Sequence, residues 1–263
     1  MKNKELSKYL EFAKEIAYKA GDLMTNSFYD EDFNIIYKKD KTPVTQIDKK
    51  INEYLIKKVN KKYPTHSVDG EEEKLIKDSE YVWVCDPIDG TSSFTRHIPV
   101  SVFSLALVYN GEPIIGVVYD PYLDEMYTAI KGEGAYLNDF QKLSVNDTKY
   151  GELGCTIDYN MWNEAKYDVY KIIGKIKKDV KICQIGSVAH ACMLISRGLI
   201  SGEIFPGTNH AHCDMAASKL IVEEAGGKVT DFKGKNQRYD QDIDGAIITN
   251  KIIHEELLKK IRS

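Results

Sequence analysis

Residues 83–94 read WVCDPIDGTSSF, an apolar, strand-like run that ends abruptly in two carboxylates, Asp86 and Asp89. Two acids at the end of a strand can hold a hard cation, and the Gly90-Thr91-Ser92 segment that follows can offer backbone N–H groups to an anion. A cation site beside an anion site predicts metal-assisted phosphate chemistry. The plainer alternative is a surface turn, because Asp-Pro and Asp-Gly both favour turns. The apolar residues on both sides favour a turn that is attached to the core.

The composition is that of a water-soluble globular protein. The chain has 263 residues, of which 43% are hydrophobic and 29% charged. The formal net charge of -4, with Lys and Arg spread along the chain, argues against nucleic acid as a partner. No run is long enough to cross a membrane, and the N-terminus lacks the apolar core of a signal peptide. We therefore expect a cytoplasmic protein with no membrane partner.

The five cysteines are an odd number and include no C-x-x-C pair. This pattern predicts neither a disulfide framework nor a structural zinc site. Most of the cysteines are expected to be small buried hydrophobic residues.

The first half of the chain predicts an α+β lobe. Apolar residues recur at helical spacing over residues 6–28, and a second helix starts near Asp48 and is stopped by Pro64. The polar stretch between them, residues 30–41, predicts a loop or a short hairpin. Strands with a hairpin-type turn between the last two are expected at residues 82–85, 101–109 and 114–119.

The second half predicts an α/β lobe in which helices alternate with short strands. Helices are expected near residues 164–177, 188–197, 215–225 and 252–261, and strands at 181–184, 200–205, 227–231 and 246–249. Because no Pro/Gly-rich linker separates the halves, we expect one catalytic unit with two lobes, about residues 1–145 and 146–263.

Three further acidic positions stand out, and each has a plain structural explanation when taken alone. Glu71 lies in the run DGEEE, which is typical of a solvated charged surface. Asp214 directly precedes a predicted helix, and Asp48 stands at the start of another, so both fit helix N-caps. Only Asp86 and Asp89, three residues apart, suggest a site by themselves.

Taken together, these motifs resemble the inositol monophosphatase family. The order is Gly-Glu-Glu at residues 70–72, then DPIDGT at 86–91, then the run DMAASKLIVEEAGG at 214–227. This family belongs to the lithium-sensitive, magnesium-dependent phosphatases that include fructose-1,6-bisphosphatases. The resemblance covers nearly the whole chain and implies a layered αβαβα sandwich, an α/β (α+β) fold. It also implies a homodimer.

The resemblance implies two or three Mg²⁺ ions per site. One ion would take Glu71, Asp86 and the carbonyl of Ile88, and a second would take Asp86, Asp89 and Asp214. A third, weaker ion would lie near Glu71. Mg²⁺ prefers oxygen ligands, and a pair of ions can clamp the attacking and leaving oxygens of an in-line displacement.

The phosphate is expected on the backbone N–H groups of Gly90, Thr91 and Ser92, where the start of a helix favours an anion. The resemblance implies that the nucleophile is a metal-activated water and that no phospho-enzyme forms. Thr91 and Asp48 match the pair that orients and deprotonates this water, and Glu71 is the other candidate. A helix cap is the structural alternative for Thr91.

Substrate choice depends on a different segment. Many family members have Trp before the last metal-binding Asp, whereas this chain has Cys213. The Glu of inositol-specific enzymes falls in register with Gly207, and Glu203 is the nearest acid, which weakens strict inositol specificity. Residues 205–212 are expected to line the leaving-group pocket, where His210 and His212 either contact the substrate or serve the structure.

These observations predict a Mg²⁺-dependent phosphomonoesterase that acts on a small polyol phosphate, with inositol 1-phosphate as the first candidate. Alternatives within the class are histidinol phosphate, fructose 1,6-bisphosphate and 3′-phosphoadenosine 5′-phosphate. A catalytically silent regulator that binds metal and sugar phosphate is the alternative from another class. A Ca²⁺-binding module ranks last, because the alternating acids of an EF-hand loop are missing.

Overall fold

The first helix pair follows from the hydrophobic pattern, as the sequence predicts. In a computed structural model, which describes residues 3–29, 35–37, 43–161 and 165–263, helix α1 spans Asn3–Phe28 and helix α2 spans Gln46–Lys62. The side chain of Thr45 caps α2, accepting a hydrogen bond from the backbone N–H of Ile47 at 3.1 Å. The Asp48 N–H also donates to Thr45 Oγ1 at 3.4 Å, and the Asp48 carboxylate accepts a hydrogen bond from the Thr45 N–H at 2.7 Å, which completes a capping box.

A short hairpin of β1 (Ile35–Tyr37) and β2 (Pro43–Thr45) joins these helices. The remainder of the predicted loop at 30–41 lies outside the described residues. The antiparallel pairing of β1 with β2 confirms the hairpin alternative for the part that is described.

A large sheet follows, with strand order β10-β9-β8-β7-β6-β5-β3-β4. All neighbours pair antiparallel except β3 and β5, which are parallel. The sequence predicts β5, β6 and β7 of this sheet, whereas β3, β4, β8, β9 and β10 are not among the predicted strands. The strands are β3 (Ser67–Gly70), β4 (Lys74–Leu75), β5 (Tyr81–Asp89), β6 (Val102–Tyr109), β7 (Glu112–Asp120), β8 (Glu125–Ile130), β9 (Gly134–Leu137) and β10 (Gln141–Lys142).

A smaller mixed sheet is built from the second half of the chain, with strand order β12-β11-β13-β15-β14. Every strand of this sheet except β11 is predicted from the sequence. The strands are β11 (Thr156–Tyr159), β12 (Lys181–Cys183), β13 (Gly202–Phe205), β14 (Lys228–Thr230) and β15 (Ala246–Thr249). The helices are α3 (Thr91–Phe94), α4 (Val169–Ile176), α5 (Val188–Ser196), α6 (Ala211–Glu224) and α7 (His254–Arg262).

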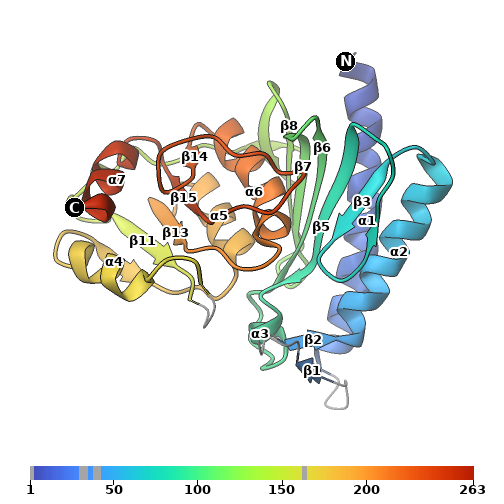
Figure 1. Ribbon diagram of the computed structural model, residues 1–263, viewed down its shortest axis with the longest axis horizontal. Coiled ribbons are helices and arrows are strands. Elements are labelled where there is room, and N and C mark those ends of the chain that lie inside the picture. Colours follow the sequence, from blue (N-terminus) through green and yellow to red (C-terminus); the bar gives the residue numbers. More distant parts are fainter. Residues whose placement is uncertain (1–2, 30–34, 38–42, 162–164) are drawn as a thin grey trace.

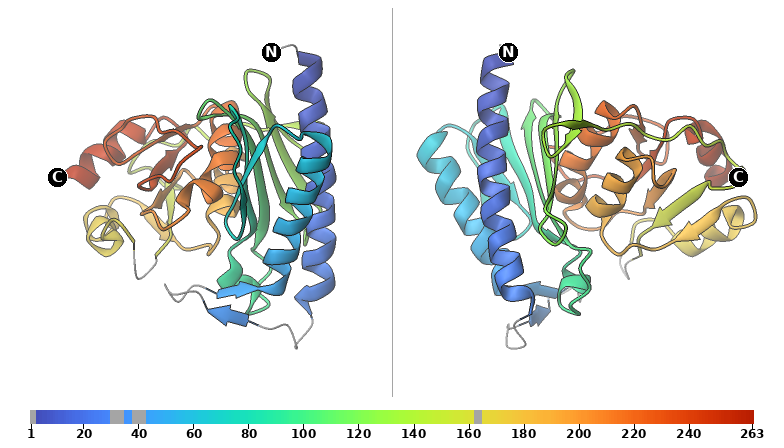
Figure 2. Two further views of the ribbon diagram at one scale, coloured as in Figure 1. Left: turned by 45° about the vertical axis from the view of Figure 1, so that its right-hand side comes forward. Right: turned by 180° about the vertical axis from the view of Figure 1, so that it is seen from behind.

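The elements stack in five layers, which confirms the predicted αβαβα sandwich (Figure 1). Helices α1 and α2 cover one face of the large sheet, and α5 and α6 lie between the two sheets (Figures 1 and 2). Helices α4 and α7 cover the outer side of the small sheet. No helix within the described residues is long and apolar enough to cross a membrane.

Helix α6 is buried on nearly all sides because it lies between the sheets. Met215, Ala216 and Ile221 are fully buried in the central core. Gly116 on β7 permits close approach of α6, because a Cβ there would lie 2.9 Å from the carbonyl oxygen of Ala217. This packing fixes the first turn of α6 against the large sheet, where the acidic residues gather.

Candidate active site

A bulge near the end of β5 brings Asp86 and Asp89 together. In the ladder with β6, Asp86 is opposite Ser104 and Asp89 is opposite Val102, so β5 carries one extra residue between the two pairs. Side chains three residues apart on a regular strand point to opposite faces, and one extra residue turns both to the same side. The spacing of the two acids therefore has a geometric reason.

The third carboxylate of this cluster comes from α6. The helix begins at Ala211, earlier than the sequence predicts, so Asp214 lies in its first turn and is not the N-cap. Carboxylate oxygens of Asp86, Asp89 and Asp214 all lie within 4.8 Å of one another. Two signature motifs that are far apart in the sequence thus meet at one point.

Burial makes this cluster unfavourable without a cation. Asp86 is 3% exposed, and burial, together with the charges of Glu71 and Asp89, raises its pKa well above the ordinary value. Burial raises the pKa of Asp89 to about 6, although hydrogen bonds from Ser187 and from the backbone N–H of Ala189 oppose the rise. A set made only of oxygen donors with excess negative charge fits a hard divalent cation such as Mg²⁺.

Glu71, Asp48 and Thr91 surround the cluster. The backbone N–H of Glu71 donates to the carbonyl of Cys85 at 3.0 Å, which places Glu71 beside the end of β5. The hydroxyl oxygen of Thr91 lies 2.9 Å from the carbonyl oxygen of Ile88 and 3.4 Å from Asp48 Oδ1. Because both neighbours are acceptors, the hydroxyl can donate to either one. Burial raises the pKa of Asp48 to about 7.

The turn after β5 has the backbone that an anion site needs. Gly90 has φ 87° and precedes α3, where Thr91 begins the helix as the sequence predicts. A Cβ at Gly90 would lie 3.0 Å from the carbonyl oxygen of Gly186, so glycine is required there. The first N–H groups of a helix have no partner within the helix, which leaves those of Thr91 and Ser92 for other acceptors.

One pocket joins the acidic cluster to this turn and to residues from the small-sheet half of the chain. His210 and His212 are among the residues that line it. The pocket walls also include Asn160, Met161, Gln184, Thr208, Asn209, Asp240 and Asp242.

Two predicted substrate residues are not among those that line the pocket. Glu203 is fully buried in β13, where it accepts hydrogen bonds from Asn160 Nδ2 at 2.7 Å and from Cys192 Sγ at 3.2 Å. Gly207 packs against the backbone of Gly245 with φ 76°. Asn160, which the sequence analysis missed, reaches the pocket where Glu203 does not.

The fold and the site define a class, the metal-dependent phosphatases. A family model described as the inositol monophosphatase family matches residues 5–263, and the chain belongs to this family. The chain is 32% identical to "Nus factor SuhB" of Pasteurella multocida, over 86% of this chain and 85% of that protein. It is 31% identical to the inositol monophosphatase of Dictyostelium discoideum, over 89% of this chain and 88% of the relative.

A solved structure of an IMPase from Thermotoga maritima is similar as well. Its TM-score is 0.85 at 30% sequence identity, and the match covers 97% of each chain. The protein therefore belongs to a family of phosphatases, which are hydrolases. The resemblance predicted from the sequence is confirmed.

Proposed function

We propose that this protein is a Mg²⁺-dependent phosphomonoesterase that hydrolyses a small polyol phosphate, with inositol 1-phosphate as the first candidate. The observation that carries the proposal is the cluster of Asp86, Asp89 and Asp214, whose carboxylate oxygens lie within 4.8 Å of one another. The same pocket contains the Gly90–Ser92 turn, which suits a phosphate.

The residues that would hold the metal ions are those implied by the family. Glu71, Asp86 and the Ile88 carbonyl would hold one ion, and Asp86, Asp89 and Asp214 a second; a third would lie near Glu71. When bound, Mg²⁺ lowers the pKa of water and stabilises negative charge on phosphoryl oxygens.

Thr91 and Asp48 orient the attacking water and handle its proton. The Thr91 oxygen can accept a hydrogen bond from water while its own hydrogen points to Asp48 Oδ1, 3.4 Å away. Through this contact Asp48 can take up the proton that the water gives up. Water then attacks phosphorus directly and gives its proton toward Asp48, and the phosphorus–oxygen ester bond breaks. The leaving alkoxide takes a proton from another water in the pocket, Asp48 returns its proton to solvent, and no phospho-enzyme forms.

The leaving group would occupy the polar part of the pocket. Asn160, Gln184 and Asn209 line this part and can exchange hydrogen bonds with hydroxyl groups. Glu203 would affect the substrate indirectly, because it accepts a hydrogen bond from Asn160 Nδ2 at 2.7 Å and so orients that side chain. Because Gly207 supplies no carboxylate at the family's inositol position, histidinol phosphate, fructose 1,6-bisphosphate and 3′-phosphoadenosine 5′-phosphate remain alternatives.

A catalytically silent regulator that binds metal and sugar phosphate is the competing function. The Pasteurella relative is named "Nus factor SuhB", a name that states no enzyme activity, and this supports keeping the alternative. The presence of all the acidic residues together with Thr91 argues for catalysis, because a silent protein has no need of the full set. The homodimer, the cytoplasmic location and the two-lobed catalytic unit expected from the sequence remain predictions.

A phosphate-release screen over the four substrates with Mg²⁺ tests the proposal. We expect release from at least one substrate, loss of release on chelation of Mg²⁺, and inhibition by Li⁺ relative to matched NaCl. The Asp214→Asn variant, purified in the same way, controls for a contaminating phosphatase. Binding of Mg²⁺ and substrate without any release would favour the regulator.

A further inference from the structure

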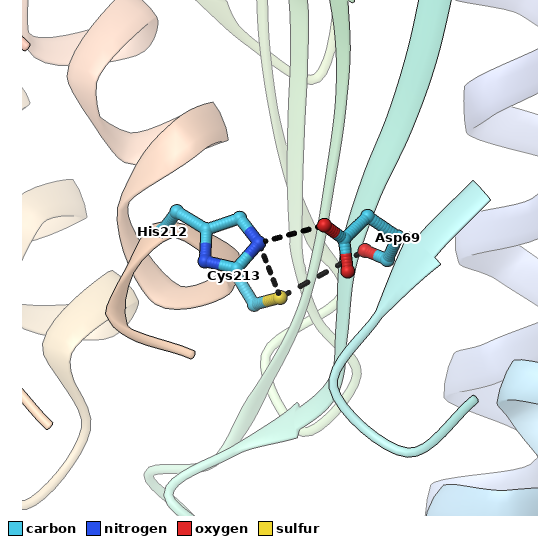
Figure 3. Close-up of side chains that lie close together, drawn as sticks. All are labelled: Asp69, His212 and Cys213. Atoms are coloured by element: carbon cyan, nitrogen blue, oxygen red, sulfur yellow. Dashed lines mark hydrogen bonds and ion pairs between the residues drawn. The ribbon is translucent and has the colours of Figure 1, made fainter. Parts of the chain in front are cut away.

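Beside the acidic cluster, three side chains of different chemistry converge. Asp69 comes from β3, whereas His212 and Cys213 come from the first turn of α6 and point toward Asp69 (Figure 3). His212 Nε2 lies 3.1 Å from Asp69 Oδ2 and 3.7 Å from Cys213 Sγ. The Cys213 sulfur is also 3.8 Å from the backbone oxygen of Asp69.

These separations fit one tetrahedral metal ion. Zinc binds sulfur at about 2.3 Å and nitrogen or oxygen at about 2.0–2.2 Å, so its ligand atoms lie about 3.3–3.6 Å apart. One atom from each of Asp69, His212 and Cys213 lies within 4.8 Å of the others, and small movements bring these atoms to the required distances. All three residues are buried, with Asp69 7% and His212 1% exposed.

The other ring nitrogen of His212 faces a carboxylate. His212 Nδ1 is buried and lacks a hydrogen-bond partner among the described residues, and it faces Asp242 Oδ1 at 3.5 Å. A metal ion on Nε2 leaves the ring hydrogen on Nδ1, where Asp242 can accept it. This carboxylate–histidine–metal arrangement is common around protein zinc.

Access and charge are also suitable. Asp69, His212 and Asp242 line the pocket, so an ion can arrive from solvent. Lys74 Nζ pairs with Asp69 Oδ1 at 2.7 Å, so a metal on Oδ2 would replace the hydrogen bond between His212 Nε2 and that oxygen and leave the Lys74 ion pair in place. The fourth ligand would be water from the pocket. Binding displaces the thiol hydrogen of Cys213 to solvent as a proton, and nothing is oxidised or reduced.

We propose that Asp69, His212 and Cys213 form a second metal site that takes Zn²⁺. Thiolate and imidazole select a softer ion than the all-oxygen cluster of Asp86 and Asp89 does. The ion would tie the first turn of α6 to β3. Zinc binding at this site does not depend on the proposed phosphatase activity.

Cobalt provides the direct test, because Co²⁺ occupies zinc sites and reports thiolate ligation by its absorption. The full-length protein is stripped with a chelator, supplied with excess Mg²⁺ to fill the oxygen cluster, and titrated with Co²⁺. We expect a thiolate-to-cobalt charge-transfer band that saturates near one equivalent and is abolished by Zn²⁺. Cys213→Ser should lose the band, whereas Cys155→Ser, a change at another buried cysteine, should keep it.

Absence of the band in the unaltered protein, or its persistence in Cys213→Ser, would overturn the proposal. If circular dichroism shows that Cys213→Ser does not fold, X-ray absorption of the unaltered protein with one equivalent of Zn²⁺ and excess Mg²⁺ decides. We expect one sulfur at about 2.3 Å with nitrogen or oxygen at about 2.0–2.2 Å. A shell without sulfur contradicts the site.

Discussion

The molecule buries two groups of carboxylates that differ in their access to the pocket. Asp86 and Asp89 line the pocket, whereas Asp158 on β11 and Glu203 on β13 are paired across neighbouring strands and are not among the pocket-lining residues. Burial raises the pKa values of all four. Hydrogen bonds from Asn160 and Cys192 enclose Glu203.

This difference in access to the pocket determines how each buried carboxylate can be stabilised. A carboxylate that solvent can reach through a pocket can be compensated by a cation, whereas an enclosed carboxylate is compensated by keeping its proton. Burial, together with the charge of Asp158, raises the pKa of Glu203 well above its ordinary value and so favours the protonated form. Position relative to the pocket, more than acidity, therefore separates a candidate metal ligand from a structural acid.

Removing one charge from the pocket-lining group should have the largest effect. We expect Asp89→Asn and Asp214→Asn each to lower kcat at least about 10²-fold, as loss of a key electrostatic group does in other enzymes. Phosphate release at saturating Mg²⁺ measures this, and circular dichroism checks the fold.

Asp147→Asn, a change at an exposed aspartate, is the matched control and should retain full activity. Full kcat in Asp89→Asn or Asp214→Asn would remove these residues from the catalytic metal site.

A smaller effect is expected at Asn160, which lines the pocket and donates a hydrogen bond to Glu203 of the enclosed pair, Asp158 and Glu203. Loss of one hydrogen bond to a substrate hydroxyl costs about 1–1.5 kcal/mol, so Asn160→Ala should raise KM about 5–10-fold with little change in kcat. Glu203→Gln should change KM less, because glutamine still offers an oxygen to Asn160 Nδ2. Unchanged KM in Asn160→Ala, measured on the best substrate of the screen, would show that this side chain does not contact the leaving group.

The enclosed pair should affect stability more than catalysis, in a pH-dependent way. Burial raises the pKa of Asp158 from 3.8 to about 7, against a hydrogen bond from the Ile185 N–H. The folded state therefore holds this proton more tightly, and its stabilising contribution is lost as pH rises from about 4 to about 7. Asp158→Asn removes the titration of this side chain. The free energy of unfolding should then decrease less steeply with rising pH, by up to about 1.4 kcal/mol per pH unit.

Urea unfolding at several pH values between 4 and 8 measures this change. Curves of equal slope for the unaltered protein and Asp158→Asn would mean that Asp158 is not the group responsible.

The sequence predicted the metal-ligand candidates more readily than the pocket. Asp86 and Asp89 are neighbours in a motif, and the long α1 and α2 follow from helical periodicity. Strand β11, with four residues, is held by its neighbours in the sheet more than by its own pattern, so Asn160 at its end escaped notice. Position along the chain also could not show that Glu203 is enclosed by Asn160 and Cys192.

The same limit applies to the proposed zinc site. The sequence argued against a structural zinc site because its five cysteines include no C-x-x-C pair, yet Asp69 and His212 meet across 143 positions of the chain. Only the packing of α6 against the large sheet brings their side chains together.

A crystal grown with Mn²⁺ and phosphate would show where the catalytic metal ions bind, because Mn²⁺ favours the same oxygen ligands as Mg²⁺ and scatters anomalously. We expect anomalous peaks within bonding distance of Asp86, Asp89 and Asp214, with the phosphate beside Gly90 and Thr91. Peaks elsewhere, or none at these carboxylates in crystals that hold the phosphate, would contradict the account.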